Sequence, residues 1–153
     1  MLSLTSPGVE QLEPRLGADL ARQSNDALAE YVRKYPDRYK GFASLSTKNP
    51  EEAAKELERS VKELGLVGWK THSNYGENYL DDKKYWPVCE RAAKLDGPVY
   101  LHPSYPSIPQ LKTPYGWALS GAPFGFGIET AMTMMRLVLS GIFDEYPGLK
   151  IIL

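Results

Sequence analysis

Cysteine is nearly absent from this chain of 153 residues, with Cys89 as its single representative. One thiol cannot form an internal disulfide, and it excludes a zinc site built from several cysteines. Such cysteine usage fits a reducing compartment, so we expect a cytoplasmic protein. No apolar run approaches the roughly 20 residues that cross a bilayer. The first residues also lack the basic start and long apolar stretch of a signal peptide.

Neither sign of charge is in excess. The chain has 18 Lys and Arg against 19 Asp and Glu, for a formal net charge of -1. Without a basic surplus to neutralise phosphates, nucleic acid and anionic membranes are poor partners. Glycine-rich phosphate motifs are missing too, since the sequence has no Gly-x-Gly-x-x-Gly after a predicted strand and no Gly-Lys-Ser/Thr loop. These absences argue against a nucleotide-binding sheet.

What the chain does have is a regular alternation of apolar strands and amphipathic helices. Short apolar segments that predict buried strands lie at residues 1–5, 41–45, 66–72, 97–102 and 149–153. Apolar residues at helical spacing fill the segments between them, at residues 14–34, 49–65, 81–95 and 127–143. Such alternation predicts parallel strands joined by right-handed crossovers, in either a doubly wound sheet or part of a (β/α)8 barrel.

The length decides how much of a barrel this is. A complete (β/α)8 barrel takes about 250 residues, and this chain holds about five of the eight βα units. It also begins and ends in predicted strands. We therefore predict an α/β fold in which residues 1–153 form a single incomplete domain, an internal piece of a (β/α)8 barrel that contains strands 2 to 6.

Both histidines stand at the ends of predicted strands. His102 follows the apolar run from Pro98 to Leu101, and Pro103 stops the strand just after it. Parallel α/β enzymes build their sites at such strand ends, and histidine is a common metal ligand. On this stretch alone, a metal ligand and a histidine that bonds a neighbouring carbonyl are equally good interpretations.

The other histidine, His72, shares a strand face with Lys70. We predict a catalytic or substrate-contacting role for His72, against the alternative of a locally bonded loop histidine. Lys70 is predicted to bind an acidic group of the substrate or to form a buried ion pair.

A long irregular segment, residues 103–123, is rich in proline, glycine and aromatic residues. Loops of this length in compact domains usually have a function. We predict that Tyr105 and Trp117 bind a flat ring substrate, although a loop that packs on itself explains the same residues.

Several longer runs together resemble one enzyme family. They are Leu2-Ser3-Leu4-Thr5-Ser6-Pro7-Gly8, Asn25-Asp26-Ala27-Leu28-Ala29, Tyr35-Pro36-Asp37-Arg38-Tyr39-Lys40-Gly41-Phe42-Ala43, Glu63-Leu64-Gly65, Tyr79-Leu80-Asp81-Asp82, Tyr85-Trp86-Pro87, Pro98-Val99-Tyr100-Leu101-His102-Pro103, Glu129-Thr130 and Ser140-Gly141-Ile142-Phe143-Asp144-Glu145-Tyr146-Pro147. In combination, the chain resembles the amidohydrolase-related metal enzymes, in the branch of the aminocarboxymuconate-semialdehyde, γ-resorcylate and 5-carboxyvanillate decarboxylases.

The resemblance implies one divalent metal, zinc or manganese, at the C-terminal face of a barrel. The family's metal-binding histidine at the end of the fifth strand falls on His102. The other family ligands belong to strands outside these 153 residues, so we expect the chain alone to be inactive. The run Thr71-His72-Ser73-Asn74 departs from the Asn-Ser-His type of run in the better-known decarboxylases, so the prediction for His72 rests on its own position.

The resemblance further implies non-oxidative decarboxylation of an aromatic or unsaturated carboxylic acid. Metal-dependent hydrolysis of a lactone or an amide is the alternative within the same superfamily. From another class, the chain is alternatively a non-catalytic interaction module that covers its terminal strands by self-association. We expect a small carboxylic acid as partner, no nucleic acid or membrane, and a possible homo-oligomer.

Overall fold

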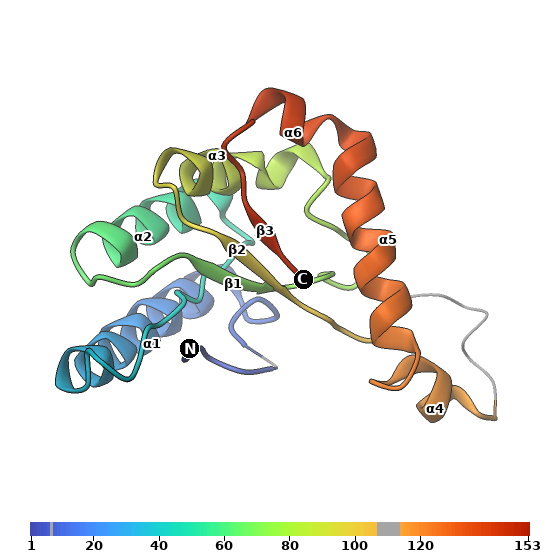
Figure 1. Ribbon diagram of the computed structural model, residues 1–153, viewed down its shortest axis with the longest axis horizontal. Helices are drawn as coiled ribbons and strands as arrows, with labels where there is room; N and C mark the ends of the chain where they lie inside the picture. The colour runs from blue at the N-terminus through green and yellow to red at the C-terminus, as the bar shows by residue number, and fades with distance from the viewer. Residues whose placement is uncertain (7, 107–113) are drawn as a thin grey trace.

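A short parallel sheet forms the centre of the fold. The computed structural model describes residues 1–6, 8–106 and 114–153 (Figure 1). The sheet has the order β1-β2-β3, with β1 at Trp69–His72, β2 at Val99–His102 and β3 at Ile151–Ile152. Both pairs of neighbours are parallel, and the register sets His72 opposite His102. The α/β class with parallel strands is thus confirmed.

The strand count is smaller than predicted. Within the part of the chain that the structure describes, three strands form, and the two N-terminal segments take part only through isolated parallel bridges. Leu2 pairs with Gly41, and Ala43 pairs with Trp69. A bridge needs a single matched residue pair, whereas a strand needs an extended ladder. The count of five barrel units therefore stays a prediction.

Helices fill most of the chain between the strands. They are α1 (Pro14–Lys34), α2 (Pro50–Lys62), η1 (Lys83–Tyr85), α3 (Trp86–Lys94), α4 (Gly116–Ser120), α5 (Gly125–Ser140) and α6 (Ile142–Glu145). Proline stands in the first turn of both α1 and α2, where its missing N–H costs nothing. None of the described helices is long and apolar enough to cross a bilayer.

A glycine divides the last predicted helix. The expected helix over residues 127–143 is instead α5 followed by the short α6, with Gly141 between them at a φ of 81°. A left-handed residue ends the helical ladder, and glycine adopts that conformation without a Cβ clash.

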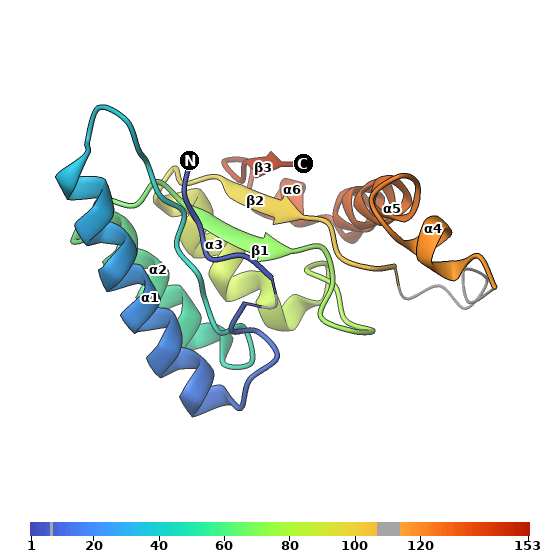
Figure 2. The ribbon, with the colours of Figure 1, turned by 90° about the horizontal axis from the view of Figure 1, so that it is seen from below.

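The two faces of the sheet have different surroundings. Figure 2 shows α1, α2 and α3 on one side of the strands. Trp69, Val99 and Leu101 belong to the buried apolar core. Because side chains alternate along a strand, Lys70 and His72 point to the opposite face, as does His102 on β2. The alternation thus places the polar residues of both strands together, away from the helices.

Candidate functional site

The two histidines meet at the C-terminal ends of β1 and β2. His72 and His102 are register partners, and their ring centroids lie 5.7 Å apart. Each is the last residue of its strand. The structure therefore brings together the two histidines that the sequence singles out.

His102 is held with one ring nitrogen free of hydrogen bonds to the residues that the structure describes. Its Nδ1 lies 2.8 Å from the carbonyl oxygen of Pro103, so Nδ1–H donates there and Nε2 keeps its lone pair. Burial lowers the pKa of His102; the hydrogen bond to Pro103 acts against this shift, and the nearby Lys70 ammonium acts with it. Metal-binding histidines are neutral and donate their other N–H in this way. The donor set thus fits one ligand of a metal ion.

His72 is engaged through both ring nitrogens. Its Nδ1 lies 3.0 Å from Glu10 Oε1, and its Nε2 lies 3.0 Å from Lys70 Nζ. Lysine has only donors, so the Lys70 ammonium donates to Nε2 and Nδ1–H donates to the Glu10 carboxylate. All three side chains are buried. Glu10, His72 and Lys70 form a continuous hydrogen-bonded chain, which we call the Glu10–His72–Lys70 chain.

Lys70 lies at the buried end of this chain, with 3% of its surface exposed. Burial lowers the pKa of Lys70, against the attraction of the Glu10 carboxylate, which raises it. The hydrogen-bond partner of this lysine is a histidine whose far side contacts the Glu10 carboxylate. The predicted role of Lys70, an ion pair or a contact with an acidic group of the substrate, stays a prediction.

Glu10 is a member of the site that the sequence does not reveal. It stands 62 residues from His72, in the segment before α1. Gly8 makes room for it, because a Cβ atom there would lie 2.2 Å from Glu10 Oε2 and 3.3 Å from the His72 ring. Gly8 also has a φ of 67°, which favours glycine. The only signal in the sequence is the turn before Val9, and a turn does not tell which side chain it aims.

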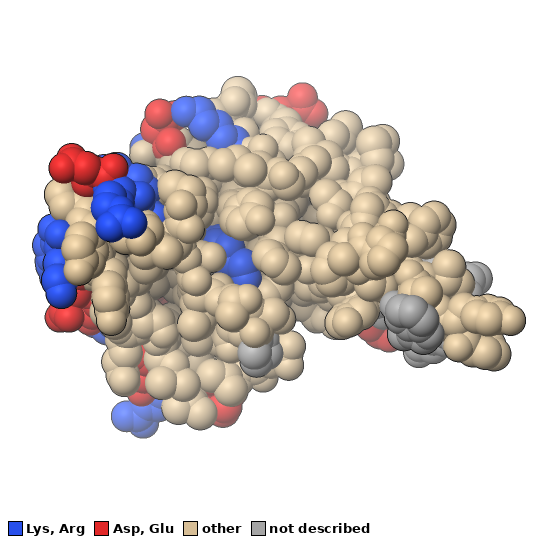
Figure 3. Space-filling view, turned by 60° about the horizontal axis from the view of Figure 1, so that its bottom comes forward, with Lys and Arg blue, Asp and Glu red and all other residues tan. Residues whose placement is uncertain are grey.

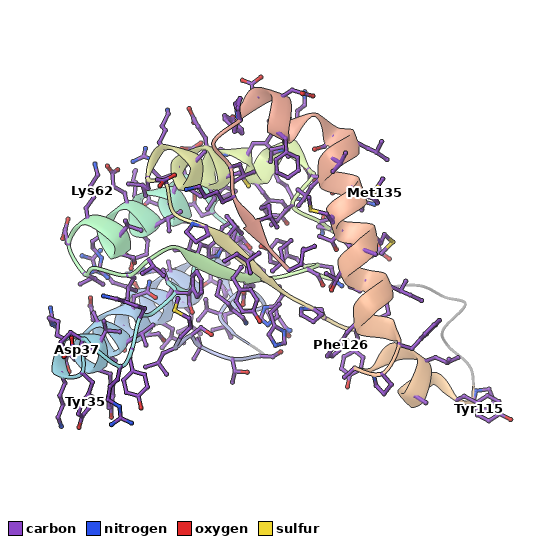
Figure 4. The ribbon with its side chains drawn as sticks, in the orientation of Figure 1. Tyr35, Asp37, Lys62, Tyr115, Phe126 and Met135 are labelled. Atoms are coloured by element: carbon purple, nitrogen blue, oxygen red, sulfur yellow. The ribbon has the colours of Figure 1, made fainter. Side chains whose placement is uncertain are left out.

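A large cavity of about 1190 Å³ opens above the two strand ends. Among the residues that line it are Glu10, His72, His102 and Tyr105. Tyr105 and Phe126, whose ring centroids lie 5.6 Å apart, form one aromatic wall of it, and Tyr75 and Tyr85 also line it. Figure 4 labels Phe126 at the N-terminal end of α5, near the end of β2. A cavity of this size holds a ring-sized ligand.

The two remaining predictions for individual side chains, Tyr105 and Trp117, have different outcomes in space. Tyr105 lines the cavity but is 68% exposed. Trp117 falls in α4, and its side chain lies outside what the structure describes. Phe126, which sequence analysis did not single out, takes a place on the aromatic wall.

A second polar cluster lies beside the cavity, between the end of β1 and α5. Asn74 Nδ2 donates to Glu129 Oε1 at 2.6 Å and to the Tyr105 carbonyl oxygen at 3.1 Å. The Tyr79 hydroxyl donates to Glu129 Oε2 at 3.4 Å. Burial, together with the Glu129 carboxylate, raises the pKa of Tyr79 to about 12. Tyr79 is therefore a permanent donor at neutral pH.

These features define a class of protein. Parallel strands that carry polar side chains to one end, beneath a cavity built from the loops that follow them, are the arrangement of α/β-barrel enzymes. Within the described ranges, no three His, Cys, Asp or Glu side chains lie close enough to hold a metal ion together. His102 would accordingly be one ligand among others.

Comparison with known proteins gives the family. The amidohydrolase family model matches residues 5–153, and the chain belongs to that family. It is 45% identical over 162 residues to a γ-resorcylate decarboxylase of Polaromonas sp. strain JS666, covering 100% of this chain and 49% of the relative. The chain thus spans about half the length of the curated relatives it matches.

Solved structures agree with this assignment. The 5-carboxyvanillate decarboxylase from Sphingomonas paucimobilis superposes with a TM-score of 0.91 at 38% identity, over 99% of this chain and 45% of that one. A dihydroxybenzoic acid decarboxylase from Polaromonas sp. JS666, with bound manganese and the inhibitor 2-nitroresorcinol, gives a TM-score of 0.88 at 44% identity, over 99% and 48%. The predicted family is confirmed, and these relatives are decarboxylases of aromatic acids.

Proposed function

We propose that these residues belong to a metal-dependent enzyme that removes CO2, without oxidation, from an aromatic acid bearing a ring hydroxyl. The observation that carries the proposal is His102, which ends β2 beneath the cavity. Its Nδ1 bonds Pro103, and its Nε2 has no hydrogen bond within the described ranges. His102 would hold a divalent metal, manganese or zinc, through Nε2. A metal bound there supplies a Lewis acid and a template for the substrate oxygens.

Lys70 is proposed to attract the acidic group of the substrate. Its ammonium is buried and donates a hydrogen bond to His72, which lines the cavity. A positive charge in a site of low dielectric strongly favours a carboxylate near it. The incoming acid would be oriented with its carboxylate toward the strand ends.

His72 is proposed to act on the reaction through Lys70. Glu10 accepts from Nδ1–H, which fixes the tautomer with Nε2 as acceptor. That acceptor holds the Lys70 ammonium in place. In this proposal His72 is a positioning residue, and Glu10 sets its orientation.

The aromatic wall is proposed to hold the ring. Tyr105 contacts Phe126 edge to face, and both line the cavity. Flat rings pack well against such walls. We also propose Trp117, which α4 places on the same stretch after His102, as part of the ring site.

Other features of the proposal rest on the sequence. The relatives named above are decarboxylases, which favours CO2 release over hydrolysis of a lactone or amide. We propose a cytoplasmic location, consistent with a buried single thiol, a single barrel domain that includes residues 1–153, and a homo-oligomer as a possible assembly.

The test uses the protein expressed from its complete gene and loaded with manganese. We expect it to release CO2 from γ-resorcylate (2,6-dihydroxybenzoate) or 5-carboxyvanillate. His102→Ala should lose most of the bound metal by elemental analysis, whereas the matched variant His72→Asn should retain it.

Three outcomes separate the alternatives. Full metal content in His102→Ala would overturn the role of His102. Hydrolysis of a lactone or amide without CO2 release would favour the hydrolase. A folded protein that binds no metal and turns over neither class of compound would favour the non-catalytic module.

A further inference from the structure

A fully buried carboxylate remains unused by the proposed reaction. Glu129, in the second turn of α5, has 0% of its surface exposed. Burying a carboxylate is costly unless strong donors compensate, and its partners in the structure are the amide of Asn74 and the hydroxyl of Tyr79. Glu129 thus connects α5 to a residue that lines the cavity.

Asn74 is fixed in one of its two amide orientations. Its two N–H groups point at Glu129 Oε1 and at the carbonyl oxygen of Tyr105, and both of these atoms only accept. A flipped amide would bring Oδ1 against two acceptors and lose both hydrogen bonds. The hydrogen-bond network therefore places Nδ2 of Asn74 toward Glu129 and Tyr105, and Oδ1 away from them.

That orientation leaves the Asn74 oxygen available. Oδ1 makes no hydrogen bond to any residue that the structure describes, and it is not among the buried atoms that lack a partner. Asn74 lines the cavity together with His102 and Tyr105. The amide oxygen is thus the polar atom that Asn74 has left for a ligand in the cavity.

The backbone around Asn74 is tied down on both sides. The amide nitrogen of Ser104 donates to Ser73 Oγ at 2.9 Å, and Thr133 Oγ1 donates to the Ser73 carbonyl oxygen at 3.4 Å. These bonds join the end of β1 to the segment after β2 and to α5. The acceptor is therefore held by three separate parts of the chain, which is how a selective contact is pre-organised.

We propose that Asn74 Oδ1 accepts a hydrogen bond from a ring hydroxyl of the aromatic acid, and that Glu129 is the positioning residue that aims it. The inference rests on the proposed function and specifies its substrate. An amide oxygen can only accept, so the facing group must be a donor. A hydroxyl satisfies it, whereas a fluorine or an ether oxygen leaves it without a partner.

The experiment compares two ligands of similar shape on the manganese-loaded protein from the complete gene. They are 2,6-dihydroxybenzoate and 2,6-difluorobenzoate, in which fluorine replaces each hydroxyl and removes its donor. Isothermal titration calorimetry gives the ratio of the two dissociation constants. The two acids also differ in ways that do not involve residue 74, but those differences affect wild type and variants alike. A change in the ratio of dissociation constants between wild type and a variant therefore reports the contact with Asn74.

Three variants test the contact and its positioning. Asn74→Leu with Glu129→Leu removes both polar partners together, and should lower the preference for the hydroxylated acid by about tenfold, the value of one hydrogen bond. Asn74→Asp with Glu129→Gln exchanges donor and acceptor between these two positions. It gives up the hydrogen bond to the Tyr105 carbonyl oxygen but keeps an acceptor at residue 74, so the preference should remain. Glu129→Gln alone lets the side chain at residue 129 donate to Asn74 Oδ1, and should lower the preference by about threefold.

The outcomes distinguish the inference from the function on which it rests. An unchanged ratio in the folded Leu–Leu variant would overturn the role of Asn74, and an unchanged ratio in Glu129→Gln would overturn the role of the Glu129 carboxylate in aiming it. Either result would leave the decarboxylase proposal standing. Wild-type protein that binds neither acid would overturn both. A preference lost in the Leu–Leu variant and retained in the exchanged pair would support the contact.

Discussion

His102 and His72 occupy equivalent positions on neighbouring strands, yet their surroundings give them different capacities. His102 donates from Nδ1 to a backbone carbonyl, and its Nε2 stays free of the side chains and backbone groups that the structure describes. His72 has a carboxylate on one nitrogen and an ammonium on the other. A free imidazole nitrogen can bind a metal, whereas an imidazole bonded on both sides can only transmit orientation or charge. At the scale of the residue, hydrogen-bond partners therefore decide function more than residue type does.

Burial decides the chemistry of Cys89 in the same way. Its side chain lies in the core, and burial raises the pKa of the thiol to about 12. Reaction with a disulfide reagent needs the thiolate. In the folded protein the Cys89 thiol therefore stays protonated and unreactive at pH 8. We expect no labelling of native protein by Ellman's reagent and one equivalent in 6 M guanidinium chloride. Cys89→Ser provides the blank, and fast labelling of the native protein would show that this part of the core opens.

At the scale of the element, the Asn25 side chain joins α1 to the backbone of Ser44. Asn25 accepts from the Ser44 amide at 2.8 Å and donates to the Ser44 carbonyl oxygen at 3.0 Å. It also donates to Glu56 on α2 at 2.9 Å. The Asn25 side chain takes the place of a neighbouring strand for Ser44, which explains how a segment with only isolated bridges stays ordered.

Figure 3 shows charged side chains gathered on the side of α1 and α2, whereas the surface toward α4 and α5 is largely uncharged.

Removing the Asn25 side-chain amide should lower the stability of the fold. Asn25→Leu leaves the buried N–H and C=O of Ser44 without partners, and each unpaired group costs about 1–3 kcal/mol. We expect the free energy of unfolding to fall by about 3 kcal/mol in urea titrations. Gln23→Leu, the same chemical change on an exposed position of α1, should alter stability by less than about 0.5 kcal/mol. Equal effects of the two substitutions would contradict the bridging role of Asn25.

At the scale of the whole molecule, sequence patterns predict what depends on local order. Pro14, Asn49 and Gly65 mark helix boundaries through their own conformational preferences, and strand alternation predicts the common face of Lys70 and His72. Glu10 and Glu129 could not be predicted in the same way, because they reach the site from segments distant in sequence. Their placement depends on tertiary packing around Gly8 and α5, which no local pattern encodes.

The ligands available within these 153 residues lead to a prediction about metal affinity. The described parts of the chain bring His102 to the cavity without two further ligands beside it, and one imidazole binds a divalent ion weakly. The 153-residue chain expressed alone should therefore bind Mn²⁺ with a dissociation constant in the millimolar range or weaker in equilibrium dialysis. His102→Asn should reduce even that binding, while His72→Asn should not. Micromolar binding by the 153-residue chain would mean that its own side chains complete the site. The protein from the complete gene would then owe its metal to a ligand set different from the one proposed here.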